Sequence, residues 1–248
     1  MFKLQQLQQQ QKILKFIQLE YLQLTIADNE QYRWLTIGDT VQTVMDKKQP
    51  YAPVLPHLSA MIMALFYQPV PKNILEMGLG GGALRRFFGH HFPSANMVSI
   101  ELEPSIISTY HEFFNPTTDV QNIVLGDAVE EIKNQESLDI AFIDLFSQAG
   151  SPEFLQREEF YRDCFKSLTP EGVLVVNLIN PLAMENQVII EMLESILEAP
   201  VKVFSVPGFK NKVVMASRKK LSHIPYNASL MAMSQRFQLS LNDIIEMK

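Results

Sequence analysis

Short stretches in which apolar and polar residues alternate occupy the first fifty positions, and turn-forming residues separate them. The pairs Asp28-Asn29 and Gly38-Asp39 fall between successive stretches. Alternation with a period of two places every second side chain on one face of a strand, and such pairs favour tight turns. The pattern predicts a small antiparallel β-meander, with strands at residues 22–26, 33–37 and 40–44. The Gln-rich residues up to about Gln11 are expected to form a frayed or helical lead-in.

From about residue 57 onward, apolar runs alternate with longer segments of helical periodicity. The expected strands are residues 74–75, 97–102, 122–125, 138–144 and 173–177. The expected helices are residues 57–67, 83–92, 104–114, 129–134, 153–168 and 182–197. Regular alternation of this kind predicts a parallel sheet with helices on both faces. Residues 201–206 and 212–217 differ, because a Pro-Gly turn joins them, and we expect an antiparallel hairpin there.

A parallel sheet that ends in an antiparallel hairpin is typical of the class I methyltransferase-type Rossmann fold. We therefore expect an α/β protein with a Rossmann-like, mostly parallel sheet, a C-terminal antiparallel hairpin and a small N-terminal β-extension. Along the chain, this predicts a lead-in with the β-extension over residues 1–52 and a Rossmann-like domain over 53–220. Residues 221–248 are expected to form a helical tail.

Composition excludes several classes of function. The chain carries a net charge of −6, and 47% of its 248 residues are hydrophobic. An acidic surface repels the phosphates of nucleic acids, so a nucleic-acid partner is not expected. The five histidines show none of the spacings, such as H-E-x-x-H, that bring ligands to one metal ion. We expect no metal cofactor.

The cysteine count and the apolar runs indicate in which cellular compartment the protein is expected. Cys164 is the only cysteine, which excludes a disulfide within the chain and fits a reducing compartment. No apolar run approaches the roughly 20 residues that cross a bilayer, and residues 1–16 lack the pattern of a signal peptide. We expect a cytoplasmic protein with no membrane partner, and the sequence leaves a homodimer open.

A glycine segment lies where the first strand of the Rossmann-like domain is expected to end and a helix to begin. Gly78, Gly80 and Gly82 alternate within the stretch EMGLGGG. Glycines at this place allow a tight turn and let a ligand approach the backbone closely. Position 83, where a dinucleotide-binding G-x-G-x-x-G segment has its third glycine, is Ala83. The segment therefore indicates a nucleotide-type ligand, and Ala83 argues mildly against a dinucleotide.

Four acidic residues, Glu76, Glu101, Asp127 and Asp144, stand at the ends of consecutive expected strands. Open α/β sheets bind their ligands at this carboxyl edge. Glu101 follows the glycine segment by about 20 residues, the spacing of an acid that holds ribose hydroxyls. Asp127, which lies beside Ala128, can accept a hydrogen bond from the amino group of adenine. Helix capping is the alternative role for one or two of these acids, though not easily for all four.

Several stretches together resemble the polyamine aminopropyltransferases, of which spermidine synthase is the type. They are ILEMGLGGGALRRFF, VSIELEP, VLGDAVEEI, LDIAFIDLF, EEFY and TPEGVLVVNL. The small β-extension and the stretch QTVMD, followed by Tyr51 and His57, match that family's layout as well. The resemblance covers roughly residues 35–217.

The resemblance implies a transferase whose co-substrate is decarboxylated S-adenosylmethionine (AdoMet) or AdoMet itself, with a small amine as acceptor. Gln42 and Asp127 would hold the nucleoside, and Glu101 would hold the ribose. The glycines from Gly78 to Gly82 would pass beneath the methionine-derived part. These positions, with Glu76 and Ala128 beside them, form the expected co-substrate site.

The resemblance also places Asp144 and Tyr51 at the positions that help to deprotonate and orient the attacking amine. A sulfonium is an already charged leaving group, so the reaction requires no general acid. An alkylammonium, with a pKa of about 10, must lose a proton before it attacks. A carboxylate together with a phenol can assist that loss.

The sequence departs from the family's pattern at two acids that would hold a diamine. The family's loop Asp-Ser-Ser-Asp-Pro becomes Asp144-Leu145-Phe146-Ser147-Gln148, so Ser147 replaces the second aspartate. The family's Tyr-His-Glu becomes Tyr51-Ala52-Pro53, so Pro53 replaces a glutamate. These departures weaken the prediction of spermidine synthesis and leave the nucleoside site intact. Methyl transfer from AdoMet to a small molecule and non-catalytic nucleoside binding stay open as alternatives.

Overall fold

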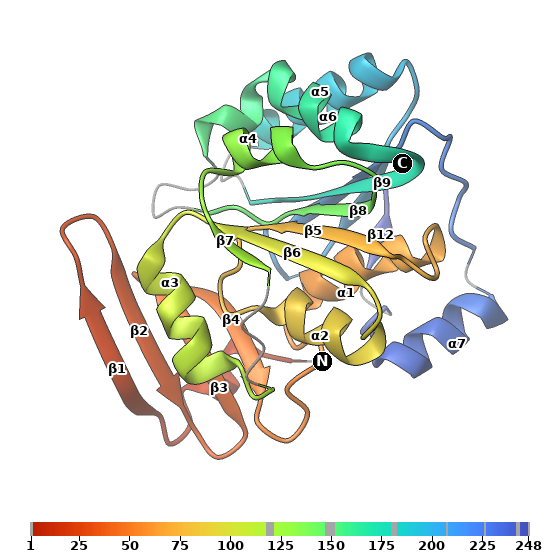
Figure 1. Ribbon diagram of the computed structural model, residues 1–248. Coiled ribbons are helices and arrows are strands. Elements are labelled where there is room, and N and C mark those ends of the chain that lie inside the picture. Colours follow the sequence, from red (N-terminus) through yellow and green to blue (C-terminus); the bar gives the residue numbers. More distant parts are fainter. Residues whose placement is uncertain are drawn as a thin grey trace.

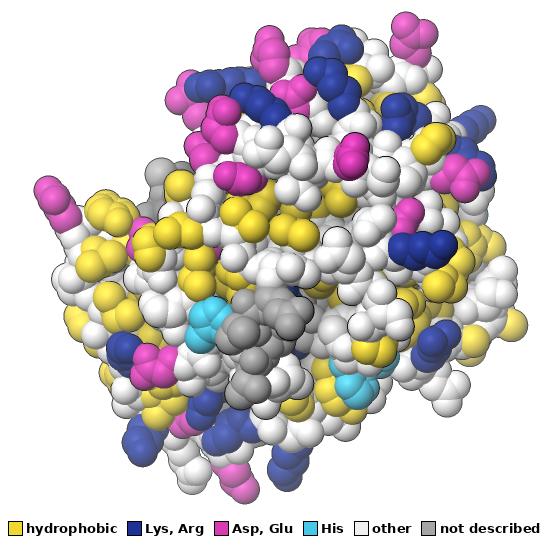
Figure 2. Space-filling model, viewed as in Figure 1, with side chains coloured by type: hydrophobic (Ala, Val, Ile, Leu, Met, Phe, Trp, Pro, Cys, Tyr) yellow, Lys and Arg dark blue, Asp and Glu magenta, His cyan; other side chains and the backbone are white. Residues whose placement is uncertain are grey.

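Two β-sheets, one small and one large, organise the chain (Figure 1). The computed structural model describes residues 2–117, 122–146, 152–179, 183–206, 208–225, 227–241 and 244–247. Figure 2 shows hydrophobic side chains gathered over the small sheet, whereas charged side chains crowd the surface over the helices at the top of the view. The expected α/β class, with a mostly parallel sheet and an N-terminal β-extension, is confirmed.

The small sheet is an antiparallel meander in the order β1-β2-β3-β4. Its strands are β1 (Lys12–Gln18), β2 (Gln23–Asp28), β3 (Tyr32–Ile37) and β4 (Thr40–Asp46). The last three correspond to the predicted meander. The sequence did not predict β1, because this edge strand leaves the apolar side chains of Ile13 and Phe16 exposed and so lacks a clean alternation.

The large sheet has the strand order β12-β10-β11-β9-β8-β5-β6-β7 among the described residues. Its strands are β5 (Asn73–Met77), β6 (Asn96–Glu101), β7 (Ile123–Leu125), β8 (Leu138–Ile143), β9 (Leu168–Leu178), β10 (Lys202–Ser205), β11 (Lys212–Ala216) and β12 (Ile245–Glu246). The five strands from β9 to β7 are parallel, and the β10–β11 hairpin adds to β9 in antiparallel fashion, as expected. The parallel strands therefore end at one common edge.

Helices cover both faces of the large sheet (Figure 1). One face carries α1 (Pro56–Ile62), α2 (Ala83–His91) and α7 (Ala228–Phe237), and the other carries α4 (Ala128–Glu131), α5 (Glu158–Ser167) and α6 (Ala183–Leu197). Short 3₁₀ helices occupy Leu4–Leu7, Met63–Phe66, Ile132–Asn134 and Glu153–Gln156. Within the strands, successive side chains enter opposite cores: Ile74 faces α1 and α2, whereas Leu75 faces the other helices.

Two segments differ from the expectation. Residues 169–172, which lie between the helix expected over 153–168 and the strand expected over 173–177, belong to β9, whose pairing with β8 shifts register between Leu138 and Ile140. The tail contains α7, as expected for a helical segment, and also β12, which pairs with β10 at the edge of the large sheet. The division of the chain at residues 52 and 220 stays a prediction.

A third core joins the small sheet to the edge of the large one. It packs Leu24, Ile26 and Leu35 of the small sheet against Tyr110 and against Leu79 of the glycine segment. Helix α3 (Pro104–Thr109), continued by a π-helix over Tyr110–Phe114, lies between the two sheets (Figure 1). The small sheet is thereby fixed over the end of β5.

Arg86, on α2, forms hydrogen bonds with three separate segments, one of which is the glycine segment. Its buried guanidinium donates hydrogen bonds to the carbonyl oxygens of Pro50 (2.6 Å), Phe114 (3.2 Å) and Gly81. Burial lowers the pKa of Arg86 to about 10, although Tyr110 and Glu76 raise it, so the guanidinium stays charged at pH 7.

Replacing Arg86 with Met should destabilise the fold strongly, because three carbonyl groups lose a charged donor. One hydrogen bond to a charged group is worth roughly 1.5–3 kcal/mol, so the free energy of unfolding in urea should fall by about 3 kcal/mol or more. Arg162→Met is the matched control, since Arg162 is exposed on α5 and pairs with exposed Glu158; it should change stability by less than about 0.5 kcal/mol. Equal losses in both variants would contradict the linking role.

Candidate active site

Two adjoining cavities, of about 490 and 410 Å³, open at the carboxyl edge of the parallel strands. We call the larger one the Glu76 cavity; Glu76, His57 and Lys210 contribute to its lining. We call the smaller one the Asp127 cavity, after an acid of its lining that lies two residues beyond the end of β7. Both are lined by Gln42, Gly78, Gly80, Asp144 and Phe146. These five residues therefore mark the place where the cavities meet.

Glu76 is a carboxyl group buried at the end of β5. Only 2% of the residue is exposed, and its Oε2 accepts a hydrogen bond from Ser99 Oγ at 2.6 Å. Burial raises the pKa of Glu76 to about 8, which outweighs the lowering by Ser99 and by Arg85. The nearby Asp144 raises it further. The carboxyl group is therefore mostly protonated at pH 7 until a cation approaches.

Asp144 is held in place by a chain of buried amides. Asn177, in β9, donates from Nδ2 to Asp144 Oδ1 at 2.8 Å, and Asn211 Nδ2 donates to Asn177 Oδ1 at 2.9 Å. Both asparagines are buried. The amide of Asn177 thereby fixes the direction of the carboxylate at the junction of the two cavities. Asn177 was not among the predicted site residues; its signal in the sequence is a lone polar residue at the end of the apolar run GVLVVNL.

His57 is a second buried titratable group in the Glu76 cavity. It lies on α1, and burial lowers its pKa although the charge of Asp144 raises it. The imidazole is consequently neutral at pH 7. It can offer one donor and one acceptor to a ligand without adding charge.

The Asp127 cavity combines acids with apolar walls. Asp127 begins α4, and its Oδ1 accepts a hydrogen bond from the backbone N–H of Val129 at 2.8 Å. The apolar walls come from Ile100, Leu102, Ile106, Ala128 and Leu145. A flat base and its ribose need both kinds of contact, so this cavity suits a nucleoside.

Glu101 has a second role that the sequence did not indicate. Its carboxylate accepts hydrogen bonds from the backbone N–H groups of Leu79 (3.1 Å) and Gly80 (3.4 Å), and from that of Glu103 (3.0 Å). Burial raises the pKa of Glu101, while these backbone hydrogen bonds lower it. Glu101 therefore lines the Asp127 cavity and also holds the glycine segment above it.

The glycines of the segment serve different purposes. Gly78 has φ +96°, and a Cβ there would overlap the backbone carbonyl of Asp144. Gly78 and Gly80 line both cavities. Gly82, with φ +65°, packs against the ring of Tyr110 and is not among the described lining of either cavity. Its place in the structure is that of a packing glycine at the start of α2.

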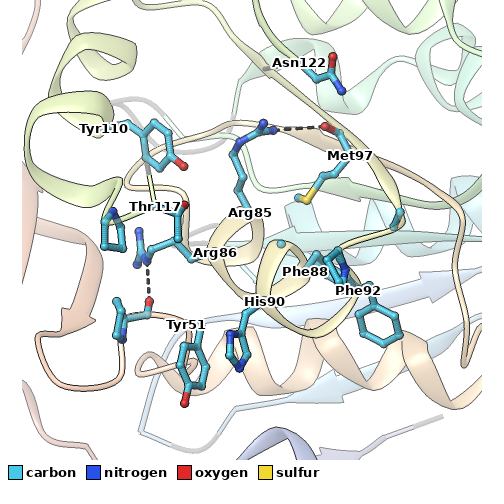
Figure 3. A pocket seen from close by; sticks show the side chains of 15 residues that line it. Tyr51, Arg85, Arg86, Phe88, His90, Phe92, Met97, Tyr110, Thr117 and Asn122 are labelled. Carbon is cyan, nitrogen blue, oxygen red and sulfur yellow. Dashed lines mark hydrogen bonds between the residues drawn. The ribbon is translucent and has the colours of Figure 1, made fainter. Parts of the chain in front are cut away.

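The structure does not bring Tyr51 to Asp144. Tyr51 lines a third cavity, of about 550 Å³, together with Arg85, Arg86 and Tyr110, and Asp144 is not part of that lining. Figure 3 shows the Tyr51 ring stacked on His90, with ring centroids 3.6 Å apart and planes 5° apart. The carbonyl oxygen of the preceding Pro50 accepts a hydrogen bond from Arg86.

Pro53 and Ser147 occupy the two positions where the family's pattern has acids. Pro53 is partly buried just before α1, and it is not among the described lining of the Glu76 cavity. Ser147 lies outside the described residues. Within the described part of the chain, no group of three or more His, Cys, Asp or Glu side chains could hold a metal ion. No described helix is long and apolar enough to cross a membrane.

Comparisons with known proteins bear on this site. The family model of the spermine/spermidine synthase domain matches residues 30–230. A polyamine aminopropyltransferase of Chromobacterium violaceum is 31% identical over 210 residues, covering 83% of this chain and 80% of the relative. A solved structure of a probable spermidine synthase from Corynebacterium glutamicum is similar, with a TM-score of 0.78 at 16% identity over 95% of this chain and 90% of that chain.

A second solved structure is a spermidine synthase in complex with the transition state analogue AdoDATO. Its TM-score is 0.65 at 17% identity, covering 92% of this chain and 88% of that chain. At such identities the two structures show a shared fold, whereas the family model extends over most of the sequence. The resemblance found in the sequence is thus confirmed, and the protein belongs to the spermine/spermidine synthase family.

Proposed function

We propose that this protein transfers an aminopropyl group from decarboxylated AdoMet to a small-molecule amine. The observation that carries the proposal is the meeting of two chemically different cavities at Asp144. One combines acids with apolar walls, and the other is lined by two carboxyl groups, of which that of Glu76 is buried. A nucleoside fits the first, and cationic alkylamines fit the second.

The nucleoside occupies the Asp127 cavity in this proposal. Asp127 and Gln42 hold the base, and Glu101 holds the ribose hydroxyls. The sulfonium then lies at the junction lined by Gly78, Gly80 and Asp144. From there the aminopropyl chain enters the Glu76 cavity, where Glu76 accepts its terminal ammonium.

The reaction needs little more than placement and one proton transfer. The lone pair of the acceptor nitrogen attacks the methylene carbon next to sulfur, the carbon–sulfur bond breaks, and its electron pair leaves on sulfur as methylthioadenosine. That lone pair is available because Asp144 has first taken a proton from the acceptor's ammonium group, and the product nitrogen keeps its two remaining protons as a secondary ammonium. Positioning the two reactants in line supplies much of the remaining rate enhancement.

The cavity also separates this activity from methyl transfer. Intact AdoMet carries a carboxylate on its amino-acid chain, which would meet Glu76 and Asp144, two acidic groups. A carboxylate there lies close to Asp144 and opposes the ionisation of Glu76, so decarboxylated AdoMet should bind more tightly. Calorimetry with both donors and with methylthioadenosine, followed by product analysis, tests the function. Tighter binding of intact AdoMet with methylated product would overturn the proposal.

Asp127→Asn should weaken methylthioadenosine binding about tenfold without destabilising the fold. Asparagine caps a helix as well as aspartate does, so the hydrogen bond to Val129 survives. The variant loses one charged acceptor toward adenine, a contact worth roughly 1.5–3 kcal/mol. Asp127→Ala is the comparison, because it removes cap and contact together and should lower the melting temperature as well. Unchanged affinity in Asp127→Asn would exclude Asp127 from the base contact.

Binding of decarboxylated AdoMet should strengthen as the pH rises through about 8, where Glu76 ionises. The ammonium of the ligand stays charged to about pH 10, so only the protein's carboxyl group changes over this range. Calorimetry in buffers of different ionisation enthalpy should show proton release below pH 8. Methylthioadenosine, which has no ammonium, should release none, and Glu76→Gln should abolish the release. Proton release that persists in Glu76→Gln would assign it to another group.

Asp144→Asn should lower kcat by about 10²–10⁴ while methylthioadenosine affinity and the melting temperature change little. Asn177→Ala should also lower kcat, because it frees the carboxylate from its hydrogen-bond partner. If Asn177 acts only through Asp144, the double variant should be no slower than Asp144→Asn alone. Additive losses would show that Asn177 contributes independently. A drop in melting temperature with full activity per folded molecule would make Asp144 a structural residue.

A further inference from the structure

The Glu76 cavity must accommodate several positive charges if the acceptor is a diamine. The aminopropyl chain ends in one ammonium, and a diamine brings two more, of which one loses its proton to react. A buried ammonium without an anionic partner is costly. The number and position of the anionic groups in this cavity therefore restrict the acceptor.

The described lining offers only two carboxyl groups, Glu76 and Asp144. Both are used by the reaction itself: one faces the aminopropyl ammonium and the other faces the attacking nitrogen. Among the described residues that line this cavity, no further carboxylate remains for the far ammonium of a diamine.

A lysine contributes to the lining instead. Lys210 lies between β10 and β11, just before Asn211, and it forms no ion pair with any residue that the structure describes. The rest of the lining includes the apolar side chains of Leu58, Leu84 and Ile179. The cavity thus combines two acids, an apolar wall and one exposed ammonium group of its own.

We infer that the acceptor is a primary amine whose far end carries a carboxylate, with an alkyl chain between the two groups. The amine would face Asp144, the chain would contact the apolar wall, and the carboxylate would pair with Lys210. This inference rests on the proposed aminopropyl transfer. The bond changes stay the same: the amine nitrogen replaces sulfur on the methylene carbon, methylthioadenosine leaves, and one proton is released.

The test compares three acceptors with similar chains over the same range of amine concentrations, with decarboxylated AdoMet as donor. They are 5-aminopentanoate, butylamine and putrescine, whose far ends are anionic, neutral and cationic. The expected order of kcat/KM is 5-aminopentanoate, then butylamine, then putrescine, with about tenfold between the first and the last. The difference should shrink at high salt, because Lys210 is exposed.

Charge reversal provides the specific control. Lys210→Glu should invert the order and make putrescine the best of the three, whereas Lys220→Glu, an equal charge change at an exposed residue outside the described lining, should leave the order unchanged. Putrescine as the best acceptor of the unaltered protein would overturn the inference and leave aminopropyl transfer standing. No transfer to any acceptor from bound decarboxylated AdoMet would overturn both.

Discussion

The close approach of two backbone segments, at Gly78 and Asp144, fixes the geometry on which the rest of the site depends. The N–H of Asp144 donates to the carbonyl of Met77 at 2.9 Å, and the N–H of Gly78 donates to that of Ile100 at 2.9 Å. The end of β5 is therefore held between its two neighbours, and a side chain at position 78 would leave no room for Asp144. Both cavities meet at this contact, so a change in its geometry alters the shape of both.

Burial then controls how much charge the Glu76 cavity holds. At pH 7 the empty cavity contains a mostly protonated Glu76, since its pKa is raised to about 8, and a neutral His57, whose pKa is lowered. An entering ammonium favours the ionised carboxylate and so creates its own partner. This coupling avoids an unpaired buried anion in the empty protein, which would destabilise the fold.

The sequence predicted the fold well wherever a local pattern and the tertiary structure agree. The alternation in β5 and β8 separates two cores, and the acids Glu76, Glu101, Asp127 and Asp144 follow strands that end at one edge. It missed β1, whose exposed edge carries no clear alternation. It also missed β12, because a strand of two residues is too short to form a recognisable pattern. It also missed Asn177 and Asn211, because a local pattern does not show a hydrogen bond between residues 33 or 34 positions apart. The only hint was the polar Asn177 within an apolar run.

The expected position of Tyr51 shows the limit of reasoning from resemblance. Its neighbours in sequence match the family, yet the tyrosine ring stacks on His90 and lines a different cavity from the two that Asp144 lines. A motif fixes the order of residues along the chain, whereas the direction of a side chain depends on contacts from distant segments. For Asp144, by contrast, that direction is set by an amide chain that the same fold supplies.

The acids at the strand ends also show why capping and ligand binding are not competing explanations. Asp127 caps α4 with one carboxylate oxygen, which leaves its second oxygen for a ligand. Glu101 accepts hydrogen bonds from backbone N–H groups of the glycine segment and of Glu103, which hold its carboxylate at the wall of the Asp127 cavity. In each case the structural contact fixes the rotamer before any ligand arrives, so binding costs less conformational entropy. The structural hydrogen bonds therefore hold each acid in the orientation that ligand binding requires.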